Sequence, residues 1–169
     1  MITLKTVGLK KLEADVNKAV RKIHGRTQKG LNAAAVKVKG DAMRLTPRDL
    51  GNLVNSAYIV WPRGSSGNKS GTKFKSGPSK TSGRTADISK LASDHVQVIA
   101  EAKARAMVWS LGWWGGPVVE IGYSAYYSIW VHEIPFTNYT KPGTQYKYLE
   151  TAVNQNRSEI LKIIAAYSK

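Results

Sequence analysis

The chain contains no cysteine, only three histidines and no apolar run long enough to cross a membrane. Without cysteine it cannot form a disulfide, a thiolate metal site or a cysteine nucleophile. Its first residues do not show the pattern of a signal peptide, which is a basic segment followed by an apolar one. No apolar stretch approaches the roughly 18 residues of a membrane-spanning helix. We therefore expect an unprocessed soluble protein with no membrane partner. Its 169 residues, 42% of them hydrophobic, predict one domain over residues 1–169.

Acidic residues are missing from residues 51–85, although the whole chain carries a net charge of +15. Residues 1–50 contribute +8, residues 51–85 contribute +6 and residues 86–169 contribute +1. A positive field of this size attracts DNA or acidic protein surfaces. The alternative is a solvated basic face that keeps the protein soluble.

The residue patterns that catalysis requires are also missing. His132-Glu133 has no second histidine at zinc-protease spacing, and His24 and His95 have no neighbouring ligand pattern. No glycine-rich phosphate loop, nucleophile elbow or close carboxylate set is found. The sequence therefore predicts a protein that is not an enzyme, with no catalytic residue, no metal site and no cofactor.

Apolar residues of the N-terminal third recur at helical spacing. The spacing predicts a helix over residues 9–23 and a second over residues 31–45, separated by Gly25 and Gly30. The second helix should end before Pro47, because the residue preceding a proline is disfavoured in the helical region.

Two segments have the β-branched and aromatic content of strands, residues 53–61 and 118–123. Between them, residues 63–86 are rich in glycine, serine, threonine and lysine, and Phe74 is their only large apolar residue. Alone in water this segment should be disordered. It is either an extended arm that a neighbour orders or a tolerated surface insertion.

Three further helical segments complete the expected fold. Asp87 can cap a third helix, Ser124 can cap a short turn, and residues 147–167 should form a closing helix. The fold class is α+β: N-terminal helices packed on an antiparallel β-sheet, with a long inserted basic loop and a C-terminal helix.

The aromatic residues of the second half have two interpretations. They fill a core, or they anchor an interface, where tryptophan and tyrosine carry much of the binding energy. Adjacent Trp113 and Trp114 cannot both point into one sheet face if the segment is extended. With Trp130 they are the candidate interface anchors. His132 is either a hydrogen-bonded histidine that fixes the turn after Trp130 or part of a contact surface.

Three short blocks, TPRDLGNLVNSAYIV, VVEIGYSAYYSIWVHE and KYLETAVNQN, follow one another along the chain. Their order and spacing resemble the head-tail joining, or tail-completion, proteins of long-tailed bacteriophages, a family often labelled minor capsid or minor tail protein. The chain departs from the family pattern at Leu50, where threonine is usual, and at Ile134-Pro135, which replaces Gly-Thr. The motif positions that match are Pro47, Gly51, Leu53, Ser56, Tyr126, Val131, His132, Glu133, Leu149 and Ala152.

The resemblance implies a non-enzymatic structural protein of the virion neck, made in the host cytoplasm, that joins the DNA-filled head to the tail. It implies a homo-oligomeric ring of six copies, with twelve as the alternative. The ring would lie between the portal-side connector and the tail tube, with genomic DNA near its lumen. On the arm, the basic residues expected to contact a partner protein or DNA are Lys69, Lys73, Lys75, Lys80 and Arg84.

Two other functions remain open at this point. A free DNA-binding protein would use the same basic half of the chain and would lose affinity steeply with salt. A minor protein bound to the capsid shell would carry the same family label. Ring formation and docking to a connector distinguish a neck protein from both.

Overall fold

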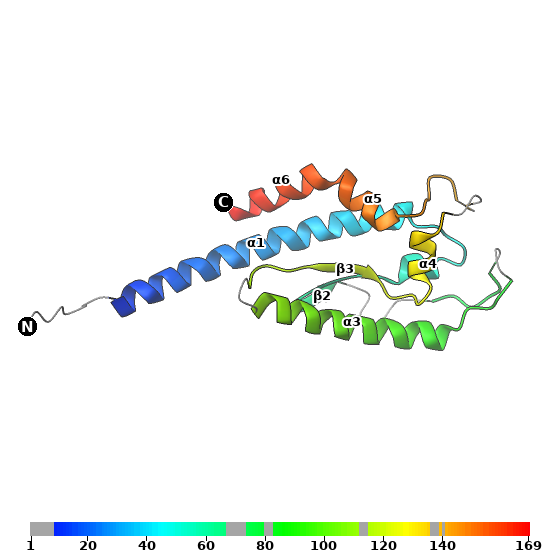
Figure 1. The fold of residues 1–169 in the computed structure, drawn as a ribbon, viewed down its shortest axis with the longest axis horizontal. Helices are drawn as coiled ribbons and strands as arrows, with labels where there is room; N and C mark the ends of the chain where they lie inside the picture. The colour runs from blue at the N-terminus through cyan, green and yellow to red at the C-terminus, as the bar shows by residue number, and fades with distance from the viewer. Residues whose placement is uncertain (1–8, 67–73, 80–82, 112–114, 136–138, 140) are drawn as a thin grey trace, which may run out of the picture.

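The computed structural model describes residues 9–66, 74–79, 83–111, 115–135, 139 and 141–169. A small β-sheet lies between the long helix α1 and the helix α3, and the C-terminal helices cover the other side of α1 (Figure 1). In chain order the elements are α1 (Leu9–Leu45), α2 (Asn52–Asn55), β1 (Ala57–Trp61), β2 (Gly64–Ser66), α3 (Ile88–Leu111), β3 (Glu120–Tyr123), α4 (Ser128–Glu133), α5 (Tyr148–Gln155) and α6 (Arg157–Ser168).

The sheet has three antiparallel strands in the order β2-β1-β3, which confirms the predicted α+β class. Its central strand β1 is buried on both faces. Tyr58 and Val60 pack with Ala102 of α3 on one face, whereas Ile59 pairs with Ile121, which packs toward α1 on the other. Because helices cover both faces, β1 is apolar throughout and does not alternate with polar residues.

The predicted break between two N-terminal helices is wrong, because α1 runs unbroken through Gly25 and Gly30. Each glycine costs an isolated helix about 1 kcal/mol, which tertiary packing can outweigh. Gly30 lies under α6, and a Cβ there would stand 3.0 Å from the Cα of Ile164. It is thus a close-packing site between helices, not a helix end. The helix ends at Leu45, as Pro47 predicts.

We expect leucine to be tolerated at Gly25 and harmful at Gly30. A Cβ at Gly25 meets nothing within 4 Å, whereas a side chain at Gly30 pushes against the backbone of α6. Gly30→Leu should therefore lower the free energy of unfolding by about 1–3 kcal/mol, the usual cost of overpacking. Gly25→Leu is the matched control and should not lower the thermal midpoint. Equal thermal midpoints for the two variants would contradict this packing.

Several predicted boundaries are corrected. The first strand starts at Ala57, because residues 52–55 form α2, and the last strand starts at Glu120. The closing helix is two helices that meet at Asn156, whose side-chain amide donates to the Ala152 carbonyl, 2.8 Å away. Asp87 caps α3 as predicted, since its carboxylate accepts from the Lys90 amide at 2.9 Å.

Candidate functional site

The three sequence blocks converge at the end of the sheet where α4 and α5 meet (Figure 1). Leu53 of the first block, Ala125 of the second and Tyr148 of the third belong to one buried cluster. The Tyr123 ring meets the Tyr148 ring edge to face, with centroids 4.9 Å apart, and the His132 ring meets it similarly at 4.8 Å. We call these five residues the motif junction.

The first block enters the motif junction through a tight turn at Gly51, whose φ of 83° lies in the left-handed region that favours glycine. Pro47 stands half-buried just after α1. Beyond α2, the Ser56 carbonyl accepts from the Ser124 amide at 3.0 Å, which joins the first block to the second. Pro47, Gly51 and Leu53 thus have structural positions.

Burial governs the titration of the tyrosines in the motif junction. It raises the pKa of Tyr123 to about 12, and it also raises the pKa of Tyr148. The Tyr123 hydroxyl lies 2.8 Å from the Thr46 hydroxyl at the end of α1. Above about pH 10 the unfolded chain ionises these phenols while the native state keeps them neutral, so stability should fall with rising pH.

A group of charged residues lies at the edge of the motif junction. The Nδ1 atom of His132 lies 2.7 Å from a Glu133 oxygen, and the Lys147 ammonium lies 3.2 Å from Glu133 and 3.0 Å from Glu150. Hydrogen bonding from His132, and then from Lys147, lowers the pKa of Glu133. The His132 carbonyl also accepts from the Lys147 amide at 2.8 Å. His132 therefore joins α4 to the start of α5, which favours its structural interpretation.

His95 of α3 makes a second polar link that sequence analysis missed. Its Nδ1 atom lies 2.6 Å from the Ser124 hydroxyl, and its ring meets that of Phe74 edge to face at 5.9 Å. Ser124 was expected to cap the following helix, but its hydroxyl lies against this buried ring instead, and α4 starts at Ser128. Burial lowers the pKa of His95, and the charge of Lys39 lowers it further.

The chain should lose stability as the pH decreases below about 6.5, the ordinary pKa of histidine. There the unfolded chain binds a proton at His95, whereas the native state resists it until a lower pH. Thermal midpoints at pH 7.5 and pH 5.5 should differ less in His95→Asn, whose amide can still reach Ser124. If both proteins lose equal stability on acidification, His95 is not the group responsible.

The basic arm is partly held by the body. Phe74 is buried in the same cluster as Leu53, and the Asn52 side chain pairs with the Lys75 backbone in both directions, at 2.7 and 3.0 Å. Farther along the arm, Pro78 and Thr85 form an isolated antiparallel bridge, and the Ser79 amide donates to the Arg84 carbonyl at 2.9 Å. With β2, these contacts show that the body of the same chain orders the described parts of a segment that should be disordered when alone in water. The side chains of Lys75 and Arg84 are exposed, and Lys69, Lys73 and Lys80 lie outside the described residues.

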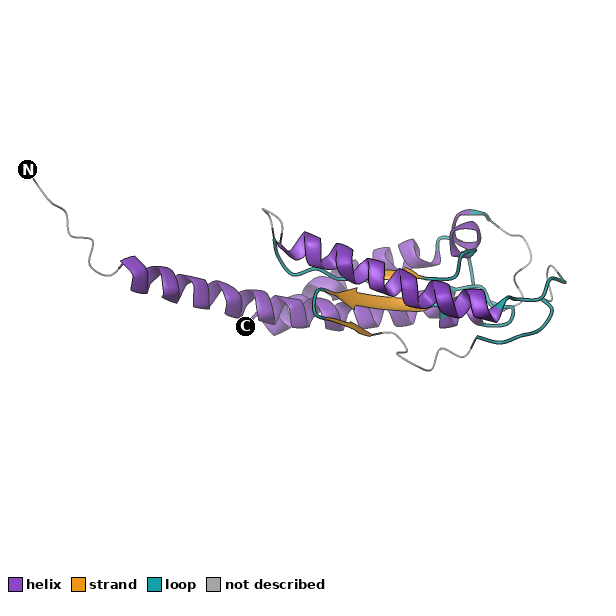
Figure 2. Ribbon diagram, turned by 90° about the horizontal axis from the view of Figure 1, so that it is seen from below, coloured by secondary structure: helices purple, strands orange, loops and turns teal. Residues whose placement is uncertain are grey.

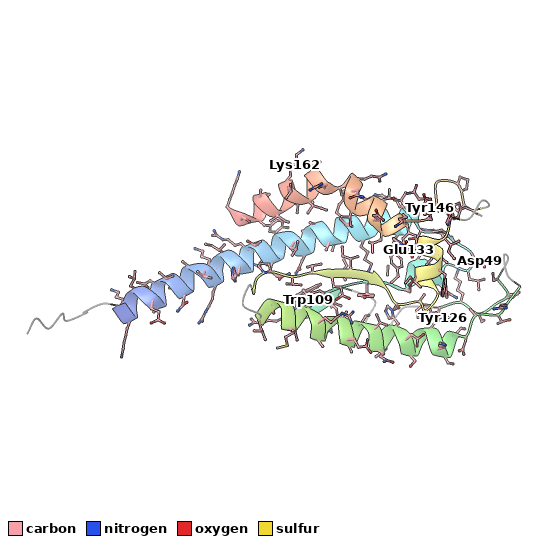
Figure 3. All side chains as sticks on the ribbon, in the orientation of Figure 1. Asp49, Trp109, Tyr126, Glu133, Tyr146 and Lys162 are labelled. Atoms are coloured by element: carbon pink, nitrogen blue, oxygen red, sulfur yellow. The ribbon has the colours of Figure 1, made fainter. Side chains whose placement is uncertain are left out.

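Apolar side chains are exposed around α4. Trp130 is 64% exposed and Ile129 is 63% exposed, while the exposed Tyr126 ring lies under the Lys90 ammonium, 4.7 Å from its centroid. We call Tyr126, Ile129 and Trp130 the α4 patch; Figure 3 labels Tyr126 beside α3 and Glu133 on α4. Trp113 and Trp114, the other candidate anchors, lie outside the described residues.

A metal-binding cluster and a membrane-spanning helix are both absent from the described part of the chain. It holds no group of three or more histidine, aspartate or glutamate side chains that could bind a metal ion. None of its helices is long and apolar enough to cross a membrane. No protein-family model, no curated protein and no solved structure matches the chain.

Proposed function

We propose that this chain is a structural protein of the phage neck, a tail-completion or head-tail connector component that joins the DNA-filled head to the tail. The observation that carries the proposal is the motif junction. Blocks up to about 100 residues apart in sequence pack together there through Leu53, Tyr123, His132 and Tyr148. The residues that carry the resemblance therefore pack against one another in the folded chain. In this proposal the chain is not an enzyme.

The surfaces around the motif junction support an assembly role. The α4 patch exposes a tryptophan and an isoleucine side by side in sequence, and such side chains anchor interfaces when a partner covers them. The arm is anchored in the same buried cluster through Phe74, and it presents the exposed basic side chains of Lys75 and Arg84. A ring of six copies, or of twelve, would use the first surface between protein subunits and the second toward connector, tail tube or DNA.

Reversing charge on the arm should weaken joining without unfolding the domain. The Lys75 and Arg84 side chains are exposed, so Lys75→Glu with Arg84→Glu should keep the wild-type thermal midpoint. Joining of heads to tails by the purified protein in a deficient extract should fall roughly tenfold, which corresponds to about 1.4 kcal/mol of contact energy. Arg157→Glu with Lys162→Glu, an equal charge change on α6, is the matched control (Figure 3). Equal losses from both pairs would show that total charge, not the arm, matters.

The second candidate function is free DNA binding, and the distribution of charge supports it. Basic side chains dominate the exposed surface of the first half of α1, opposite its apolar residues. A DNA-binding protein would bind duplex DNA without forming a ring and would lose affinity with salt. Incubation of the purified chain with heads, tails and competing duplex DNA tests this alternative. Joining of heads to tails that persists with excess DNA supports the neck role. A minor protein of the capsid shell would instead bind to heads that lack a connector.

A further inference from the structure

The N-terminal half of α1 is an amphipathic helix that extends beyond the rest of the molecule (Figures 1 and 2). Leu12 is 60% exposed and Ile23 is 58% exposed, and Val16, Ala19 and Val20 between them are exposed as well. Large apolar side chains arranged along one helix face mark a contact surface. We call Leu12, Val16, Ala19 and Ile23 the α1 seam.

The α1 seam continues a face of α1 that is already covered farther along the helix. In the second half of α1, Gly30 lies against Ile164 and Tyr167 of α6, and the buried Ala34 and Val38 follow at helical spacing. This cover ends where the Arg26 guanidinium donates to the Lys169 carbonyl at 2.7 Å. The same face thus packs against a helix on one side of Arg26 and is exposed on the other.

The spacing of the α1 seam is that of a coiled coil. Its residues follow one another at intervals of four, three and four, so they occupy alternating a and d positions of a heptad. An a/d stripe with Val20 beside it fits against one other helix, whereas a helix that lies in a lipid surface has a wide apolar face with large aromatic side chains. The α1 seam contains no aromatic residue. A helix is therefore the partner that this face fits.

We propose that the α1 seam pairs with the α1 seam of a second copy of this chain, in antiparallel orientation. In that register Leu12 packs on Ile23 of the other copy and Val16 packs on Ala19. The flanking charges fit the same register, because Asp15 on the edge of the stripe then faces Lys22 of the other copy, and the reverse pair forms by symmetry. A parallel pair would instead place Asp15 beside Val20 and Lys22 beside Thr27 of the other copy, so this ion pair would not form.

The geometry of the proposed pair also matches the ends of the elements. The second α1 would cover the first from about Leu12 to Ile23 and end near Arg26, where the C-terminal end of α6 starts to cover it, so one face of α1 would be covered over nearly its whole length. Pairing does not have to supply the free energy of helix nucleation, because the second half of α1 is already folded against α5 and α6. The contact is two-fold and uses each α1 once, which leaves the α4 patch available for other contacts. It does not depend on the neck role.

Engineered cysteines test both the pair and its direction, since the chain has no cysteine of its own. Full-length Leu12→Cys and Ile23→Cys proteins would be oxidised separately and as a mixture. In the antiparallel pair residue 12 lies beside residue 23, whereas two copies of residue 12 are about 16 Å apart, beyond disulfide reach. The mixture should give mostly the mixed disulfide dimer, and neither protein alone should give much. Self-linked dimers from each protein alone, or no dimer at all, would overturn the proposal.

A charge exchange provides the second test. Asp15→Lys and Lys22→Asp should each weaken dimerisation at least threefold in sedimentation equilibrium, and the double variant should recover it. Arg21→Asp, opposite the α1 seam, makes the same charge change as Lys22→Asp and should leave dimerisation unchanged. Failure of the double variant to recover would overturn the register. A chain that stays monomeric but binds anionic vesicles or duplex DNA through this helix would overturn the pair itself.

Discussion

Replacing Tyr148 with alanine should lower the free energy of unfolding by about 3–5 kcal/mol, the range for deleting a large buried aromatic side chain. Tyr148 is 1% exposed and is the largest fully buried side chain among the described residues. Its ring contacts the rings of Tyr123 and His132, so the substitution empties the centre of the motif junction. Urea unfolding monitored by circular dichroism measures the loss.

Tyr148→Phe removes the hydroxyl and keeps the ring, so it separates their contributions to stability. The hydroxyl donates to the Ser128 carbonyl over 3.3 Å, a long hydrogen bond, so its removal should cost only about 1 kcal/mol. If alanine costs no more than phenylalanine at this position, the three sequence blocks are not held together by the tyrosine ring.

Replacing Phe74 with alanine should cost about 3 kcal/mol and should release the basic arm. Phe74 packs with Leu53, Leu91 and the other members of the buried cluster, and its ring meets His95. With the anchor removed, the Asn52 pairing with the Lys75 backbone has to hold this part of the arm alone. Trypsin should then cleave after Lys75 or Arg84 well before it cleaves elsewhere.

Phe74→Leu is the control for this prediction. Leucine keeps an apolar group in the cluster, so the arm should stay protected and the stability loss should be smaller. Cleavage at the same rate in wild type, Phe74→Ala and Phe74→Leu would mean that Phe74 does not anchor the arm. Joining activity of Phe74→Ala, assayed below its unfolding temperature, then shows whether the anchored form is the active one.

The sequence predicts this fold best where local chemistry determines it. Pro47 ends α1 after Leu45, Asp87 caps α3, and Pro62 follows the last residue of β1. Leu91, His95 and Ala102 recur along α3 at helical spacing and all three are buried, because this periodicity follows the side of the helix that meets the body.

Tertiary contacts account for what local patterns could not predict. Gly30 resembles a helix end, but it lies against the backbone of α6, more than 100 residues later. Phe74 stands alone in a polar segment, and only the folded chain provides its partners. Its isolation as the one large apolar residue between positions 63 and 86 was the available signal for an anchor.

The sequence identified several residues of the candidate site, but it did not predict what most of them do there. Leu53, His132 and Glu133 were selected through the resemblance, and the structure places the first in the core and the other two beside Lys147. The link from His95 to Ser124 joins residues 29 positions apart that no short motif connects. Such pairs depend on how a helix and a strand pack, which local sequence does not specify.

The most direct test of the neck role is electron microscopy of a lysate from the encoding phage with a stop codon at Trp130, which removes α5, α6 and most of α4. The account predicts DNA-filled heads beside separate, finished tails, and joined particles again when the intact chain is supplied in trans. Intact infectious particles without the chain would contradict the neck role and favour free DNA binding. Empty or unstable heads would contradict it as well and would place the protein in DNA retention or on the capsid shell.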